Sequence, residues 1–217
     1  MKFLTEVKSL LIQEFVLEWR LRSAINGILL YVGGMIFMVA LSYRDGIGDR
    51  VWYTTFWIVN FFIALQTVSK SFIGETDGQF AYRYQLSGAV PLIVSKLIYN
   101  CVLALFIILF SSGLFITFLG NPIKDFIEFF WVVILGALNL ASSLTLISAL
   151  VSATGNKGSL MATLSFPILF PQLLLLLRLS DQAFGGILFS KDLFYASALI
   201  VVNISLSIIL FPILWKQ

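Results

Sequence analysis

Residues 92–119 read LIVSKLIYNCVLALFIILFSSGLFITFL and contain one charged side chain, that of Lys96. A helix needs about 20 apolar residues to cross the roughly 30 Å hydrocarbon core of a bilayer, so this stretch exceeds a single crossing. We therefore expect a membrane-spanning helix here that tilts or projects from the bilayer.

The rest of the chain repeats this apolar pattern. Hydrophobic residues make up 59% of the sequence and charged residues only 12%, which is too little polar surface for a water-soluble particle of 217 residues. With residues 92–119, six apolar segments are present, the others being Ala24–Leu41, Val51–Val68, Phe126–Val151, Ser159–Leu177 and Leu193–Trp215. The sequence predicts an all-α integral membrane protein with one domain, residues 1–217, in which residues 24–217 form a six-helix bundle. Pro167 and Pro171 predict a bend or break in the fifth membrane helix.

Residues 1–23 have a different pattern, in which apolar and charged side chains alternate. The apolar positions are Phe3, Leu4, Val7, Leu10, Leu11, Phe15, Leu17 and Trp19, and the charged ones among them include Lys8, Glu14, Glu18 and Arg22. Their three- and four-residue spacing predicts an amphipathic helix lying on the membrane surface. A helix that packs on a partner, or that simply anchors the terminus, fits the same pattern.

The lysines and arginines of the connections indicate how the bundle is oriented. Six crossings place both termini on one side of the membrane. The connections on that side carry nine basic residues, Lys2, Lys8, Arg20, Arg22, Lys70, Arg83, Lys96, Lys157 and Lys216, against five on the other, Arg44, Arg50, Lys124, Arg178 and Lys191. Because cytoplasmic loops are enriched in Lys and Arg, we expect both termini in the cytoplasm.

The sequence offers no candidate for covalent chemistry. It has no histidine, one cysteine (Cys101) and no GxxxxGK[ST] phosphate loop, so we assign no catalytic, cofactor-binding or metal-binding residue. Nucleotide hydrolysis would have to come from another chain. The basic residues are spread along the connections, which does not predict a nucleic-acid partner.

Two connections on the cytoplasmic side are candidate functional surfaces. Residues 69–91 read SKSFIGETDGQFAYRYQLSGAVP, and residues 152–158 read SATGNKG. A short surface helix within residues 72–84 would present acidic and aromatic side chains to a partner's groove. A solvated loop with its aromatic rings at the headgroup boundary fits equally well. The second connection is expected to form a tight turn.

Polar side chains also occur within the fourth apolar segment. They are Asn139, Ser142, Ser143, Thr145 and Ser148. We expect them to hydrogen-bond across a helix interface, with a polar substrate path as the alternative.

Three stretches resemble the haem exporter protein B (CcmB) family, the permease subunits of the cytochrome c maturation ABC system. They are SFIGETDG (71–78), LSGAVPLIVSK (86–96) and LISALVSATGNKGSLMATLSFPILFPQLLLL (146–176), and the resemblance extends over the whole length. It implies an ABC-2-like permease in the bacterial inner (cytoplasmic) membrane. The family's Pro-rich run is thinner here and partly replaced by QLSGA, so no role is carried over to residues 82–89.

The resemblance also implies partners. The permease would be a homodimer that binds a cytoplasmic ABC ATPase (CcmA-like) and a haem-handling membrane protein (CcmC-like), and that acts indirectly on a periplasmic haem chaperone (CcmE-like). ATP would be bound only by the ATPase, and haem would be a handled species, not a covalent cofactor. The candidate ATPase-coupling surface is formed by Phe72, Glu75, Asp77, Gly78, Lys96, Asn156 and Lys157.

Several mechanisms remain open at this point. The subunit would either export haem or use ATP hydrolysis to release the haem-loaded chaperone, and the lack of histidine ligands favours release. A non-transporting scaffold for haem-handling assembly factors explains the missing catalytic residues equally well. A secondary transporter is disfavoured because the helix centres carry few charged groups. Glu75→Lys is expected to weaken ATPase association, whereas Ile107→Val, at an expected lipid-facing position, is not.

Overall fold

The computed structural model describes residues 2–20, 22–43, 47–73, 88–152, 157–185 and 191–214. Over these ranges the chain is helical apart from short turns and contains no strand. The helices are α1 (Lys2–Arg20), α2 (Arg22–Ser42), α3 (Asp49–Ile73), α5 (Ala89–Leu119), α6 (Phe126–Ser152), α7 (Lys157–Gly185) and α8 (Lys191–Leu214). The predicted all-α class is confirmed.

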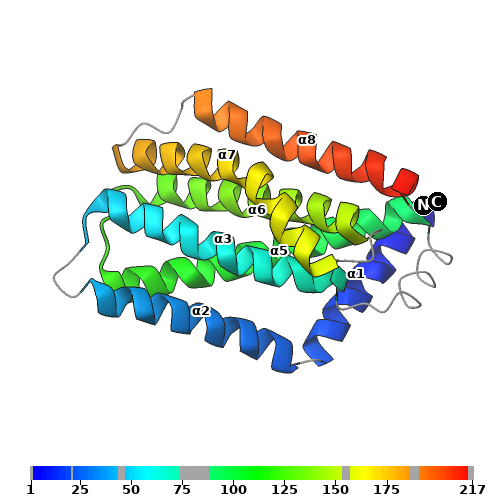
Figure 1. The fold of residues 1–217 in the computed structure, drawn as a ribbon, viewed down its shortest axis with the longest axis horizontal. Helices are drawn as coiled ribbons and strands as arrows, with labels where there is room; N and C mark the ends of the chain where they lie inside the picture. The colour runs from blue at the N-terminus through cyan, green and yellow to red at the C-terminus, as the bar shows by residue number, and fades with distance from the viewer. Residues whose placement is uncertain are drawn as a thin grey trace.

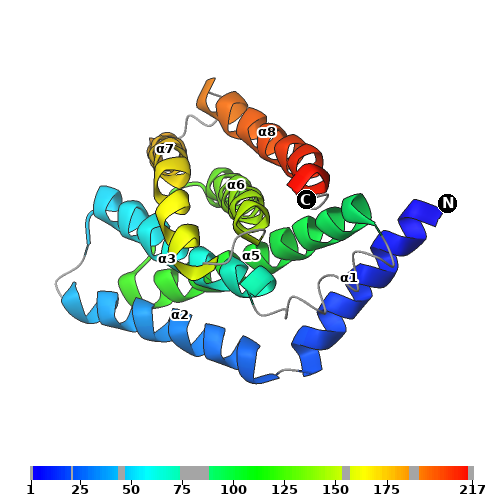
Figure 2. The same ribbon diagram turned by 45° about the vertical axis from the view of Figure 1, so that its right-hand side comes forward.

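Helix α6 forms the centre of the bundle. It packs against α3, α5, α7 and α8, which surround it in Figure 2. Small buried residues such as Gly136, Ala137 and Ala141 let these neighbours approach closely. Of the membrane-length helices α6 is the most buried and α8 the least.

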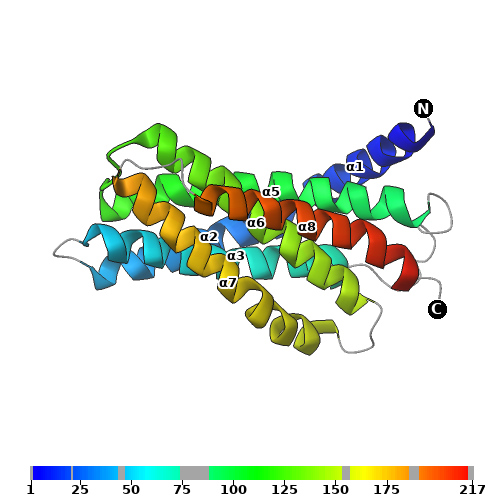
Figure 3. The same ribbon diagram turned by 90° about the horizontal axis from the view of Figure 1, so that it is seen from above.

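Helices α1 and α2 lie at the edge of this core. Helix α2 packs on α5, and its buried residues Ile28, Val32 and Ile36 follow a four-residue spacing that forms one face. Helix α1 also packs on α5 but points away from the bundle, as Figure 3 shows.

The two ends of the bundle differ in what they gather. At one end, here called the terminal end, α1 and α5 begin and α3 and α8 end (Figure 1). The opposite end holds the start of α3, the end of α5 and the start of α6. The main helices therefore run up and down between these two ends.

The distribution of side chains is that of a membrane protein. Five helices are long and apolar enough to cross a bilayer, over Asp49–Val68, Ala89–Leu119, Phe126–Val151, Thr163–Gly185 and Lys191–Leu214. Large apolar side chains such as Leu30, Met38 and Ile127 are exposed, while Asn60 and Asn100 are buried. The chain is thus a multi-pass helical membrane protein. In α2 the shorter apolar stretch Asn26–Ser42 is present, so a sixth crossing stays a prediction.

Helix α7 corrects one predicted boundary. The fifth segment was expected to end at Leu177, but the helix continues to Gly185. Its added turns pack on α3, where Ser180 and Asp181 accept hydrogen bonds, so this polar stretch is helical and not an external loop. Pro167 and Pro171 lie within the helix, which bends without breaking (Figures 1 and 2).

The predicted cytoplasmic connections are shorter than expected. Helix α3 continues to Ile73 and α5 already begins at Ala89, while α6 reaches Ser152 and α7 starts at Lys157. The predicted surface helix therefore falls, beyond Ile73, outside the described residues. Helix α1 is confirmed as a helix, and Val7 and Leu10 form its buried side, but its position on a membrane surface stays a prediction.

Candidate functional site

The predicted coupling residues lie at or near the terminal end as far as they are described. Phe72 belongs to the last turn of α3 and Lys157 is the first residue of α7. Glu75, Asp77, Gly78 and Asn156 fall outside the described residues. Lys96 is the member of the predicted set whose side chain the structure describes, and its surroundings are given next.

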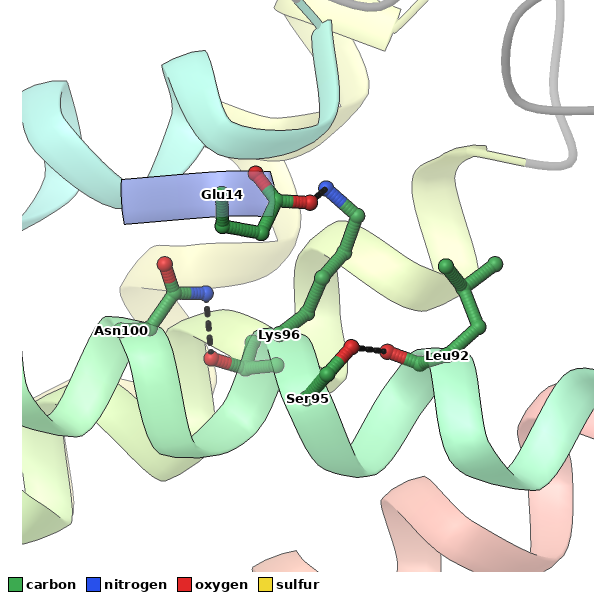
Figure 4. A network of polar contacts seen from close by, with 6 residues as sticks. Glu14, Leu92, Ser95, Lys96 and Asn100 are labelled. Carbon is green, nitrogen blue, oxygen red and sulfur yellow. Dashed lines mark hydrogen bonds and ion pairs between the residues drawn. The ribbon is translucent and has the colours of Figure 1, made fainter. Parts of the chain in front are cut away.

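Lys96 is buried in the contact between α5 and α1. Its side chain is 0% exposed, and its Nζ lies 3.3 Å from Oε1 of Glu14, whose side chain is 11% exposed (Figure 4). Lys96 is therefore covered by α1, and its part in the ATPase-coupling surface stays a prediction. Without Lys96 the basic residues of the predicted connections still stand at eight against five, so the predicted orientation is unchanged.

Apolar contacts on both sides hold this ion pair in place. Leu10 of α1 packs into a buried cluster with Leu92 of α5 and Phe211 of α8. On the other side, the rings of Phe15 and Tyr99 meet edge to face, with centroids 5.3 Å apart. An ammonium group buried in this way is costly unless a carboxylate compensates it, which is the arrangement seen here.

One turn further along α5, a second polar contact faces the centre of the bundle. Asn100 Nδ2 donates to Thr145 Oγ1 of α6 at 2.9 Å. The first half of α5 is therefore held to α1 by Lys96 and to α6 by Asn100, as Figure 4 shows for the α5 side. Such cross-helix hydrogen bonds fix the relative position of helices where water does not compete.

A polar node joins three helices deeper in the bundle. Ser143 Oγ of α6 accepts from Gln172 Nε2 of α7 at 2.7 Å and from Asn203 Nδ2 of α8 at 2.8 Å. Its own hydroxyl has two possible acceptors, the backbone oxygen of Asn139 at 2.9 Å and Oε1 of Gln172 at 2.8 Å. The hydrogen and both lone pairs of the Ser143 hydroxyl thus have partners.

The predicted hydrogen bonding across helix interfaces is confirmed for Asn139, Ser143, Thr145 and Ser148, whereas Ser142 donates to the Asn139 carbonyl of its own helix. In addition to Ser143, Asn139 Nδ2 donates to the backbone oxygen of Ala196 in α8 at 3.0 Å, and Thr145 accepts from α5. Sequence reasoning missed the partners Gln172 and Asn203. The signal was present, because a lone amide side chain in an apolar helix requires a hydrogen-bond partner inside the bundle.

At the opposite end, aromatic side chains join α3 to its neighbours. Trp52 stacks on Phe56 with ring centroids 5.5 Å apart, and it meets Phe115 of α5 and Phe129 of α6 edge to face. Its Nε1 donates to the backbone oxygen of Gly120, just beyond the end of α5, at 3.2 Å. Gly120 has φ +85°, a conformation that suits glycine and that turns the chain out of α5.

Helix α3 is also held to α7 at this end. Tyr53 Oη donates to Asp181 Oδ1 at 2.7 Å, and Trp57 Nε1 donates to Ser180 Oγ at 2.7 Å. These two hydrogen bonds explain why a polar stretch that resembles a loop continues as helix.

Two further features concern metal ligands and the space between α3 and α5. Within the described ranges, no three His, Cys, Asp or Glu side chains gather as a metal site. A crevice between α3 and α5, lined by Ala64, Thr67, Val68, Ala104, Ile107 and Ile108, has a volume of about 10 Å³. That is room for about one water molecule, far below the volume of a small-molecule site. Ile107 lines this crevice and is 3% exposed, so its expected lipid-facing position is wrong.

Comparisons of this chain with protein-family models, with curated proteins and with solved structures find no match.

Proposed function

We propose that this chain is the membrane subunit of an ABC complex, in which a separate ATPase drives movement of its helices. In this role the residues 72–84 and the α6–α7 connection form the contact with the ATPase at the terminal end. The chain itself binds no nucleotide.

The observation that carries this proposal is the way α3 and α5 are joined. They are the two helices that lead into and out of residues 74–87, the connection that contains Glu75 and Asp77. Far from that connection, Trp52 of α3 binds the Gly120 carbonyl and packs on Phe115 of α5. A push on the connection would therefore move two helices whose other ends are bound together, and would reach the opposite side of the membrane.

The sequence resemblance supplies the biological setting of the proposal. In that setting the complex is a homodimer of this chain with a CcmA-like ATPase in the bacterial inner membrane, with both termini cytoplasmic. Its work is release of a haem-loaded CcmE-like chaperone from a CcmC-like partner. Export of haem itself is the other form of the proposal. The lack of histidine ligands for haem supports release.

The test is to identify what this chain binds in its native membrane. The tagged protein is extracted in a mild detergent, and proteins that co-purify are identified by mass spectrometry. Recovery of an ABC ATPase together with haem-handling proteins is the expected result. Haem-handling partners without any ATPase would favour the scaffold, and recovery of neither would contradict both.

A further inference from the structure

Helix α1 packs along the first half of α5 and, less extensively, on α2. Among the described side chains of α1, the apolar residues Val7 and Leu10 are buried, and Glu14 forms an ion pair with Lys96 of α5. Much of its remaining surface is apolar and exposed, including Leu4, Ile12 and Val16. Helix α1 therefore contacts the bundle through one side, and Figure 3 shows that it extends away from the other helices.

We infer that the Glu14–Lys96 ion pair locks α1 to the first half of α5, so that the two helices move as one rigid unit. A surface anchor would need only the apolar side of α1, which lipid could cover. A carboxylate that reaches a fully buried lysine is different, because separating the two charges would leave the lysine without this partner in a low-dielectric interior. The ion pair therefore resists any motion of α1 that is not shared by α5.

The position of the ion pair along α5 indicates which helices it connects. Lys96 lies between Leu92, which contacts the cluster around Leu10, and Asn100, which holds α5 to Thr145 of α6. A displacement of the first turns of α5 is thus passed to α1 on one side and resisted by α6 on the other. The part that this unit plays in ATPase coupling rests on the proposed function, whereas its rigidity belongs to the chain alone, so the two can fail separately.

The experiment measures the mobility of α1 in the full chain, without an ATPase. Spin labels are placed at two exposed positions, Leu4→Cys on α1 and Phe110→Cys on α5, in a Cys101→Ser background. Pulsed EPR in nanodiscs then gives the distribution of distances between them. Labelled chain is diluted with an excess of unlabelled chain so that a dimer carries one labelled copy, and the parent protein is then expected to show one narrow distribution.

Four variants decide the outcome. Lys96→Met and Glu14→Gln should each broaden the distribution at least about twofold, since either removes the attraction between the two opposite charges. The exchange Glu14→Lys with Lys96→Glu should narrow it again, because the opposite charges are restored. Lys8→Met, which removes an exposed lysine of α1, is the matched control and should leave the distribution unchanged.

The inference is overturned if Lys96→Met and Glu14→Gln keep the narrow distribution, or if the charge exchange fails to recover it. Should Lys96→Met not insert or fold, Glu14→Gln decides alone, because it changes a residue of α1 and keeps the size of the side chain. An unchanged distribution in that variant would assign α1 docking to its apolar contacts.

Discussion

Gly136 of α6 faces the indole ring of Trp57, and a side chain at this position would overlap the tip of that ring. Trp57 cannot easily give way, because it is fully buried and its Nε1 is bound to Ser180. Gly136→Ala is therefore expected to lower the free energy of unfolding by about 1–3 kcal/mol through overpacking. Titration with SDS, followed by tryptophan fluorescence, measures this change.

Gly113→Ala in α5 is the matched control for this prediction. An added side chain there meets no neighbouring atom within 4 Å, so it should leave the stability unchanged or slightly higher. Equal stabilities of the two variants would mean that the close approach of α3 and α6 at Gly136 is not needed.

Other individual residues show where sequence reasoning reaches its limit. The polar positions Asn139 and Ser143 could be predicted to bind across an interface, because they are amide and hydroxyl groups in an apolar helix. The partner of Lys96 could not. Glu14 lies in a helix whose charge pattern fits equally well with a surface helix, and only the docking of α1 on α5 brings the two together.

At the scale of the elements, Ser143 connects three helices. Ser143→Ala leaves the amide groups of Gln172 and Asn203 without their shared acceptor, and should destabilise the protein by about 1–2 kcal/mol. The same SDS titration measures it. Ser112→Ala, which removes a hydroxyl that donates to the Leu109 carbonyl of its own helix, should cost clearly less. A similar loss in both variants would show that the node adds little to the packing of α6, α7 and α8.

The elements themselves were largely predictable from apolar segments, since a bilayer sets the length of each. The residues 126–151 and 193–215, for example, agree closely with α6 and α8. The prediction failed at the end of α7, where Arg178, Asp181 and Gln182 resemble a loop. There Asp181 binds Tyr53 and Gln182 binds Asp192, so tertiary contacts keep a polar stretch helical.

At the scale of the whole molecule, the number of crossings determines where the termini lie. Because α1 begins and α8 ends at the same end of the bundle, we expect six crossings that include α2. The excess of Lys and Arg in the connections at that end predicts that both termini lie in the cytoplasm. Green fluorescent protein fused to either terminus should fluoresce, and alkaline phosphatase inserted at Asn121, after α5, should be active. Termini on opposite sides would mean that α2 does not cross the membrane.

The central claim is that a separate ATPase acts on this chain through residues 72–84. The most direct measurement is the vanadate-sensitive ATPase activity that co-purifies with the tagged protein, compared between the parent, Glu75→Lys and the exposed α5 variant Phe106→Leu. We predict activity with the parent and with Phe106→Leu, and reduced recovery or uncoupled hydrolysis with Glu75→Lys at an equal amount of inserted protein. Equal activity in all three would contradict the coupling site, and no activity in any would contradict the ATPase-driven function.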